Sequence, residues 1–276
     1  MNPTALPERI LKIAADAEFG AVAVAVHDYE SEWEFALEGE RVFHAASTIK
    51  VAILLAIYKL AEEGRLHLDD TLHVRNRFRS LADGAVFRVA ANRDGEGAVH
   101  RRVGRSMRVR ELARAMITRS SNLATNLLLE HVGIEAVRGV LTEAKIEGVE
   151  IARGVEDTRA FEQGISNRVT ARGLVRLFRL LCEGDFVREE TRAQMLEILH
   201  AQEFNGMIPE GLPKDARVAH KTGEISTVCH DAGIVFLPNR KPYVLAILAE
   251  MPASVETRSV PVAEISRAIF ETLKTR

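Results

Sequence analysis

Cysteine and histidine are sparse in this sequence, and their spacing excludes the common metal sites. Two of the 276 residues are cysteines, Cys182 in an apolar helical run and Cys229 in an expected strand. This is neither a zinc pattern nor a disulfide framework. We expect two buried free thiols, with a single disulfide as the alternative. The nine histidines include no His-x-x-x-His pair, so we expect no metal ion and no cofactor.

An excess of charge and a long apolar run are also lacking. The formal net charge is −2, which gives no electrostatic reason to bind nucleic acid or a membrane surface. The longest apolar stretch ends at Tyr58 and Lys59, too short to span a bilayer. We therefore expect a monomer whose partner is a small molecule.

The first residues lack the basic and apolar regions of a secretory signal. Two interpretations of the location stay open. The protein is cytoplasmic, or it is periplasmic or secreted and an export signal has been removed.

Strand patterns lie at both ends of the chain and helical patterns in the middle. Alternating or continuous apolar runs predict strands, and apolar residues three and four apart predict helices. The expected strands are residues 20–27, 33–37, 217–223, 231–237 and 242–249, with a short pair at 86–89 and 99–103. The expected helices are residues 7–18, 47–64, 109–140 (interrupted at 120–122 and 133), 170–183, 189–202 and 261–274.

These patterns favour an α+β fold. The economical arrangement is an antiparallel sheet built from both chain termini and flanked by helices, with an inserted all-α lobe. We expect a single domain over residues 1–276. Its α/β lobe would comprise about residues 1–45 and 205–276, and its all-α lobe about residues 46–204, in which residues 141–169 are predicted to form a loop.

Ser47 and Lys50 form the only Ser-x-x-Lys in the chain, at the start of the first long apolar helix. Residues three apart lie on one helical face, so the two side chains should meet. A serine becomes a nucleophile when a neighbour takes its proton, and a buried lysine with a lowered pKa can do so. The alternative is a serine that only caps the helix.

Two further motifs follow in order: Ser120-Ser121-Asn122 in the helical middle and Lys221-Thr222-Gly223 on a late strand. Each alone could be a helix cap or a turn. Together with Ser47-x-x-Lys50 they resemble the signature of the class A β-lactamase and penicillin-binding-protein superfamily. The segments Gly64–Asp70 and Met116–Leu129 are also similar to that family.

The resemblance implies catalytic roles for four side chains. Ser47 would attack the substrate carbonyl, and Lys50 would help to deprotonate it. Ser120 would pass a proton to the leaving nitrogen, supported by Lys221 across the cleft.

The resemblance also implies a substrate-binding set. Asn122 would bind the acyl side chain, and Thr222 and Gly223 would lie on an edge strand along which the substrate docks. The backbone N–H groups of Ser47 and Glu224 would form the oxyanion hole.

The sequence departs from the family in several places. Ser121 stands where the family usually has aspartate. In the loop that carries the deacylating glutamate of class A β-lactamases, the Glu-x-x-Asn pattern is missing. Glu156 is the candidate for this role, with Asp157 and Glu162 behind it, and a solvent-facing loop acid is the alternative.

Near the last motif, the Glu224 side chain would repel an anionic substrate unless it turns away. No arginine occupies the family's carboxylate-binding place in this hairpin, and His230 is the candidate there. A hydrogen bond within the hairpin is the alternative role for His230.

The favoured function is a serine hydrolase that forms an acyl-enzyme on Ser47 and hydrolyses β-lactam antibiotics, rapidly or slowly. Three alternatives stay open. They are a penicillin-binding D-Ala-D-Ala peptidase, an esterase or amidase of unrelated substrate, and a sensor domain that is acylated and not turned over.

Overall fold

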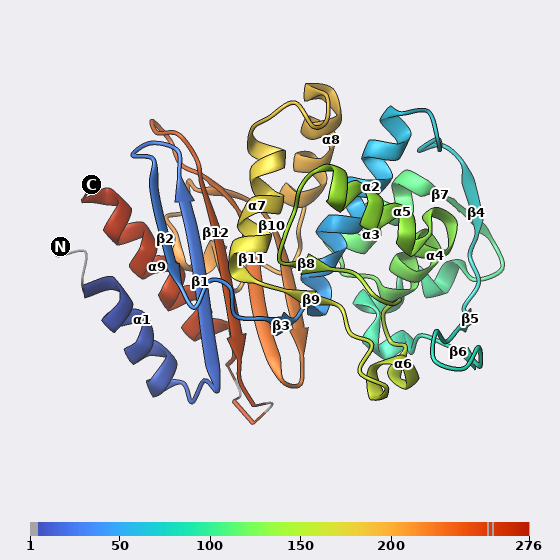
Figure 1. Ribbon diagram of the computed structural model, residues 1–276, viewed down its shortest axis with the longest axis horizontal. Helices are drawn as coiled ribbons and strands as arrows, with labels where there is room; N and C mark the ends of the chain where they lie inside the picture. Colours follow the sequence, from blue (N-terminus) through green and yellow to red (C-terminus); the bar gives the residue numbers. More distant parts are fainter. Residues whose placement is uncertain (1–4, 253, 256, 276) are drawn as a thin grey trace.

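A five-stranded antiparallel sheet is formed by both ends of the chain, as expected (Figure 1). The computed structural model describes residues 5–252, 254–255 and 257–275. The strand order is β10 (Arg217–Ile225), β11 (Val228–Phe236), β12 (Tyr243–Glu250), β1 (Ala21–Asp28) and β2 (Trp33–Leu37). Strand β10, which carries the third motif, is an edge strand.

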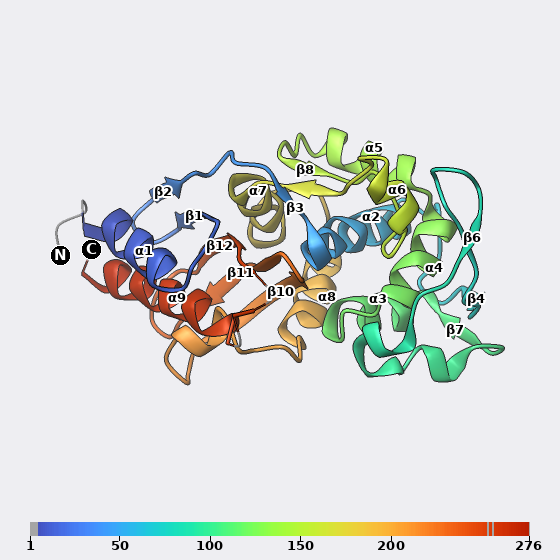
Figure 2. The ribbon, with the colours of Figure 1, turned by 90° about the horizontal axis from the view of Figure 1, so that it is seen from below.

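The interior strand β1 is buried on both faces, and alternate side chains point to opposite faces of the sheet. Ala21, Ala23 and Ala25 belong to the larger core cluster with the helical lobe. The larger side chains of Val22 and Val24 face the second cluster, beneath α1 (Ala5–Asp16) and α9 (Ser259–Lys274). Seen from below, α1 and α9 lie on one side of the sheet and α7 on the other (Figure 2).

The second lobe is built around α2 (Lys50–Glu62), which is buried nearly all round. A helix that is apolar on every side needs neighbours on every side. The helices that contact it are α3 (Val109–Thr118), α4 (Asn122–Val132), α5 (Ile134–Glu143) and α8 (Glu189–His200), and the short helix α6 (Thr158–Glu162) lies in the same lobe (Figure 1). The interruptions predicted at 120–122 and 133 are therefore confirmed.

Three predicted details are wrong. The strand expected at residues 86–89 is β6 (Val86–Phe87), but its partner is β5 (Phe78–Arg79). Residues 99–103 contain the 3-10 turn η4 (His100–Arg102) instead of a strand. Helix α7 (Ala171–Cys182), which was expected in the all-α lobe, packs on the sheet strands β1, β11 and β12.

The lobe is not purely helical either, since short strands complete it. They are β4 (Thr71–His73) with β7 (Ser106–Arg108), and β8 (Val149–Glu150) with β9 (Arg168–Val169) and β3 (Phe43–His44). Strand β3 leads directly into the Ser47 turn.

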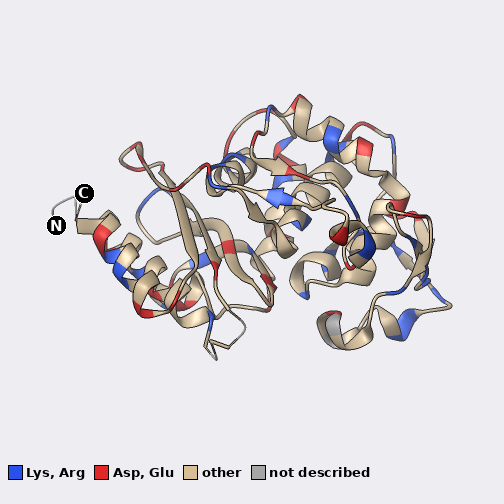
Figure 3. Cartoon of the chain, turned by 60° about the horizontal axis from the view of Figure 1, so that its bottom comes forward, with Lys and Arg blue, Asp and Glu red and all other residues tan. Residues whose placement is uncertain are grey.

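Both cysteines are free thiols, as expected, but only Cys229 is buried, and Cys182 is half-buried. Within the described part of the chain, no helix has the length and apolarity needed to cross a membrane. Acidic and basic residues alternate over both lobes, without a large region of one sign (Figure 3).

Candidate active site

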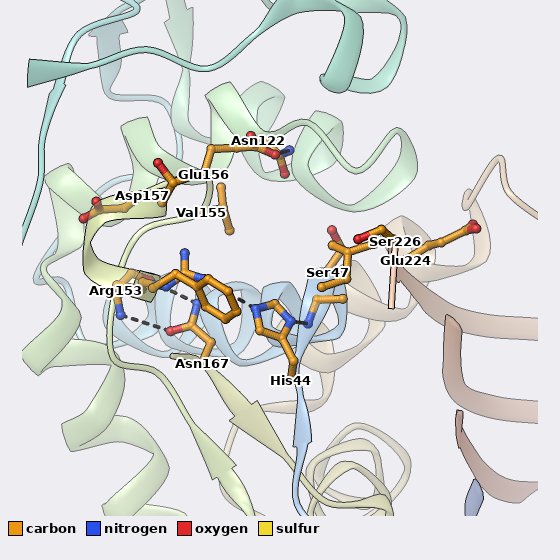
Figure 4. A pocket seen from close by; sticks show the side chains of 14 residues that line it. His44, Ser47, Asn122, Arg153, Val155, Glu156, Asp157, Asn167, Glu224 and Ser226 are labelled. Atoms are coloured by element: carbon orange, nitrogen blue, oxygen red, sulfur yellow. Dashed lines mark hydrogen bonds between the residues drawn. The ribbon is translucent and has the colours of Figure 1, made fainter. Parts of the chain in front are cut away.

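Ser47 lies in a tight turn that precedes α2 rather than in the helix itself. The turn is the 3-10 segment η1 (Ala46–Ile49). Ala46 adopts a left-handed φ of 45°, which is uncommon for a residue with a Cβ. Its backbone N–H donates to His44 Nδ1 at 3.0 Å. The half-buried Ser47 side chain faces the pocket drawn in Figure 4.

Lys50 is fully buried at the start of α2. Its Nζ donates to the Ser120 carbonyl and to Asn122 Oδ1, each at 2.7 Å, and to Ser120 Oγ at 3.1 Å. The ammonium therefore connects the first motif to the second. The Ser47 and Lys50 side chains were expected to meet, but the hydrogen bonds of Lys50 among the described residues go to Ser120 and Asn122.

Two buried lysines face this site, and burial lowers the pKa of each. For Lys50, burial and then the nearby Lys221 charge hold the pKa well below its ordinary value, while Asp94 and Glu156 oppose the shift. Burial lowers the pKa of Lys221 to about 7, against the attraction of Asp231. A lowered pKa increases the fraction of neutral amine that can accept a proton.

The second motif forms the turn between α3 and α4. Ser120 adopts a left-handed φ of 54°. Ser121 is the N-cap of α4, and its hydroxyl accepts a hydrogen bond from Ala124 N at 3.1 Å. The capping role that we considered for this motif is therefore real, but it falls to Ser121 and leaves Ser120 and Asn122 directed at Lys50.

The third motif brings the edge strand β10 against the Ser47 turn. Lys221 Nζ donates to the Thr222 carbonyl at 2.9 Å. At Gly223, an added Cβ would lie 2.9 Å from Thr48 Cγ2 and 3.1 Å from Ser47 N. Glycine is therefore required by this close approach of the two backbones.

We expect Gly223→Ala to lower the rate at which Ser47 is acylated by about tenfold, because the methyl group moves β10 away from the turn. Gly139→Ala in α5 is the control. Nothing lies within 4 Å of its added Cβ, and it should stabilise the helix by about 0.5–1 kcal/mol. Acylation kinetics and thermal unfolding of both variants provide the measurement, and equal acylation rates would contradict the argument.

Glu156 approaches the second motif from the loop before α6. Asn122 Nδ2 donates to Glu156 Oε1 at 3.2 Å. The preceding residue is held by Asn126, whose side chain bonds both the N–H and the carbonyl of Val155 at 2.9 Å. Glu156 itself adopts a left-handed φ of 62°. The loop thus directs one carboxylate and one apolar side chain at the pocket.

Of the two acids named behind Glu156, Asp157 also lines the pocket, but its carboxylate is already hydrogen-bonded. Asp157 is buried and caps α6, accepting hydrogen bonds from Ser80 Oγ and from the backbone of Leu81 and Ala160. Its carboxylate is therefore occupied in holding the loop to the β5–β6 hairpin. Glu162 is exposed at the end of α6.

The Glu224 side chain is turned aside by an arginine that the sequence analysis missed. Arg258 Nη1 lies 3.1 Å from Glu224 Oε1 and donates to the Ile225 carbonyl at 2.7 Å. This ion pair partly neutralises the carboxylate that was expected to repel an anionic substrate. Arg258 lies 34 residues after Glu224, so no local pattern pointed to it.

His230 is not a substrate ligand, which corrects the prediction. Its ring is fully buried in β11. Nε2 bonds the His44 carbonyl at 3.0 Å, and Nδ1 accepts from Ala249 N at 3.1 Å. Burial lowers its pKa to about 4, so the ring is neutral at pH 7. Both nitrogens anchor β11 to its neighbours, including the strand that leads to Ser47.

His230 should make the fold sensitive to acid. An unfolded histidine titrates near 6.5, so the unfolded chain binds more protons than the folded one between pH 6.5 and 4. The stability from neutral His230 is present above pH 6.5 and is lost as the pH falls through 4, by about 3 kcal/mol at most. Urea unfolding at several pH values should show that the difference in free energy of unfolding between the parent and His230→Gln becomes smaller as the pH falls.

The exposed His67 provides the control for this measurement. The gap between the parent and His67→Gln should not change with pH. A His230→Gln gap that stays constant between pH 7 and 4.5 would contradict the assignment.

The pocket has a volume of about 530 Å³ and lies between the Ser47 turn, β10 and the loop that carries Glu156. Ser47, Asn122 and Glu156 line it, as does Glu224 (Figure 4). Among the lining residues that were not singled out from the sequence are His44, Arg153 and Phe161.

These three form one unit. The His44 ring meets Phe161 edge-on at 5.5 Å, and the Arg153 guanidinium lies 5.4 Å from the centre of the Phe161 ring. His44 lies 109 residues before Arg153 in the chain, so no local pattern connected it with the loop that carries Arg153 and Phe161.

Comparison with known proteins identifies the family. The sequence model of the β-lactamase enzyme family matches residues 5–273. The chain belongs to this family. A β-lactamase from Streptomyces fradiae is 28% identical over 232 residues, covering 74% of this chain and 75% of that protein.

Solved structures agree with this assignment. A variant of the class A β-lactamase of the last common ancestor of Gram-negative bacteria superposes with a TM-score of 0.86 at 25% identity, covering 98% of this chain and 99% of that one. PBP-A, solved as a point mutant in an acyl-enzyme complex with penicillin G, gives 0.83 at 26% identity, covering 99% and 98%. The protein is a serine β-lactamase-like hydrolase with the class A fold.

Proposed function

We propose that this β-lactamase-like hydrolase cleaves β-lactams through an acyl-enzyme on Ser47. The observation that carries the proposal is the buried Lys50, which bonds Ser120 and Asn122 directly behind the half-buried Ser47. Acyl transfer to serine needs a base that takes the proton of the serine hydroxyl. A desolvated amine that is hydrogen-bonded to a second hydroxyl can be that base.

Acylation would use the three motifs in turn. The Ser47 hydroxyl gives its proton to neutral Lys50 while its oxygen forms a bond to the lactam carbonyl carbon. The N–H groups of Ser47 and Glu224 stabilise the oxyanion. The carbon–nitrogen bond then breaks, and the proton reaches the leaving nitrogen through Ser120, whose Oγ is 3.1 Å from Lys50 Nζ.

The substrate would lie along β10. Thr222 and Gly223 flank the nucleophile on this edge strand, and Asn122 offers its amide to the acyl side chain. With His230 occupied elsewhere, the guanidinium of Arg258 beside Glu224 is our candidate for attracting the substrate carboxylate.

Deacylation would depend on Glu156. A carboxylate beside Asn122 can hold a water and take its proton as the water attacks the ester, which releases the ring-opened acid and restores Ser47. The proton is returned to Ser47 Oγ as its bond to the acyl carbon breaks, which restores the hydroxyl.

A second function is favoured by Val155. The residue that Asn126 holds on both sides is apolar, and the carboxylate comes one position later. If the base is poorly aligned, the acyl-enzyme would persist, as the acyl-enzyme of a penicillin-binding peptidase does. PBP-A, itself solved as an acyl-enzyme with penicillin G, is among the similar structures.

Intact-mass spectrometry after mixing with benzylpenicillin tests the proposal. We expect an adduct of one penicilloyl group that is absent from Ser47→Ala, and that clears while penicilloate accumulates. An adduct that persists for hours would replace hydrolysis by the penicillin-binding function. No adduct on the parent protein would overturn the proposed function.

A further inference from the structure

A buried carboxylate outside the three motifs touches the second motif. Asp94 lies between the 3-10 turns η2 (Ala91–Arg93) and η3 (Gly95–Gly97), in the long segment between β6 and β7. It is 1% exposed. An ionised carboxylate at this depth is costly unless it is paired and hydrogen-bonded, so its partners show what it stabilises.

Asp94 joins the second motif to a histidine. Its Oδ1 accepts hydrogen bonds from Ser121 Oγ at 3.0 Å and Leu123 N at 2.9 Å. Its Oδ2 lies 2.6 Å from His100 Nδ1. The other ring nitrogen of His100 is 3.0 Å from the Val89 carbonyl, so the histidine is anchored to the segment that carries Asp94.

The turn that Asp94 holds is the one that faces Lys50. The carbonyl and hydroxyl of Ser120 and the amide of Asn122 are the three acceptors of the Lys50 ammonium. Ser120 keeps a left-handed φ of 54°, a conformation that persists only when the surroundings fix it. Asp94 holds Ser121 and Leu123, which follow Ser120 in the chain.

Gly95 allows this contact. An added Cβ there would lie 1.9 Å from the Arg119 carbonyl, immediately before Ser120. The Asp94 segment is therefore in contact with the turn on both sides of Ser120.

We propose that Asp94, supported by His100, is a positioning residue that sets the Ser120–Asn122 turn against Lys50 for acylation of Ser47. The inference rests on the proposed function. It gives the segment between β6 and β7 a role in the site, since the second motif has no carboxylate of its own.

The charge of Asp94 also acts on Lys50. Asp94 and Glu156 raise the pKa of Lys50, against the larger lowering by burial and by Lys221. Removing the Asp94 charge should therefore shift the acid limb of the acylation rate to lower pH, because Lys50 would lose its proton more readily. A purely structural residue would leave that limb in place.

A double-mutant cycle tests the proposal. Asp94→Asn removes the charge and keeps the size. Ser121→Asp moves a carboxylate to the N-cap of α4, where it can accept from Leu123 N and Ala124 N. In the Ser121→Asp single variant this second carboxylate would face the Asp94 carboxylate, because Ser121 Oγ of the parent is only 3.0 Å from Asp94 Oδ1. Each single variant should therefore be impaired and the double variant restored.

The readout is the second-order rate of Ser47 acylation by benzylpenicillin from pH 5 to 9, with the unfolding midpoint of each variant. We expect a fall of about tenfold or more in Asp94→Asn, a shifted acid limb, and recovery of most of the rate in the double variant. His100→Gln should give a smaller loss in the same direction. Asp69→Asn, an exposed carboxylate bonded to Arg110 on the same lobe, should acylate like the parent.

Three results would overturn the inference. The first is an Asp94→Asn rate within twofold of the parent (about 0.4 kcal/mol in the barrier). The second is a lower rate with an unmoved acid limb and no rescue by Ser121→Asp, which leaves Asp94 a folding role only. If neither Asp94→Asn nor the double variant folds, His100→Gln decides, and a parent-like rate there is the third. A parent protein that forms no adduct would instead overturn the proposed function itself.

Discussion

Lys50→Met should acylate Ser47 with benzylpenicillin about a hundred- to ten-thousandfold more slowly than the parent protein, the range expected when a general base is removed. Methionine fills a similar volume in the same buried position. It supplies no amine to accept the Ser47 proton, and it leaves the Ser120 carbonyl and Asn122 Oδ1 without the donor that now bonds them at 2.7 Å. Rapid-quench intact-mass spectrometry would measure the rate directly.

Lys59 provides a matched control on the same helix. Its Nζ bonds the Phe186 carbonyl, far along α2 from the pocket. Lys59→Met should acylate at the parental rate even if its unfolding midpoint falls. A folded Lys50→Met that acylates within threefold of the parent would show that Lys50 is not the base.

Glu156→Gln should affect the second half of the reaction and leave the first half nearly unchanged. The amide keeps the size of the side chain and can still meet Asn122, but it cannot take a proton from water. We expect hydrolysis of the acyl-enzyme to slow by about a hundred- to ten-thousandfold. The penicilloyl adduct on Ser47 would then accumulate and persist.

Variants of two neighbouring acids are the controls. They distinguish a specific role of Glu156 in deacylation from a general effect of negative charge in the loop. Glu162→Gln should turn over like the parent, because Glu162 is exposed. Asp157→Asn should lower the unfolding midpoint, since Asp157 caps α6 and holds the Ser80 segment. If Glu156→Gln and the parent clear the adduct at the same rate, the deacylating base lies elsewhere. If the parent itself never clears it, the penicillin-binding function stands.

Much of the fold could be predicted because its elements are locally encoded. The apolar spacing predicted α7 and α9 to within about two residues, and continuous apolar runs predicted β1 and β12. The pair expected at 86–89 and 99–103 failed because strand partners are chosen by long-range pairing. Val86 pairs with Arg79, and the alternation of apolar and polar residues around residue 100 does not reveal this pairing.

The candidate site divides in the same way. Ser47, Lys50, Ser120 and Lys221 could be named from the sequence because each lies in a short motif whose chemistry is tied to its spacing. His230 could not be judged, since its alternation fits a strand whichever group its ring meets. Asp94 stood in a mixed-charge segment with nothing local to distinguish it from a solvated acid.

The sequence by itself determined most of the elements of this β-lactamase-like hydrolase and the candidate reactive side chains, because helical period, strand alternation and motif spacing act over a few residues. The tertiary structure decided which groups face each other. It brought Asp94 to Ser121 and Asn126 to Val155, paired Glu224 with Arg258, and buried His230 against His44. These contacts join residues 27 to 186 positions apart. They form only in the folded chain, where most buried polar groups have a hydrogen-bond partner.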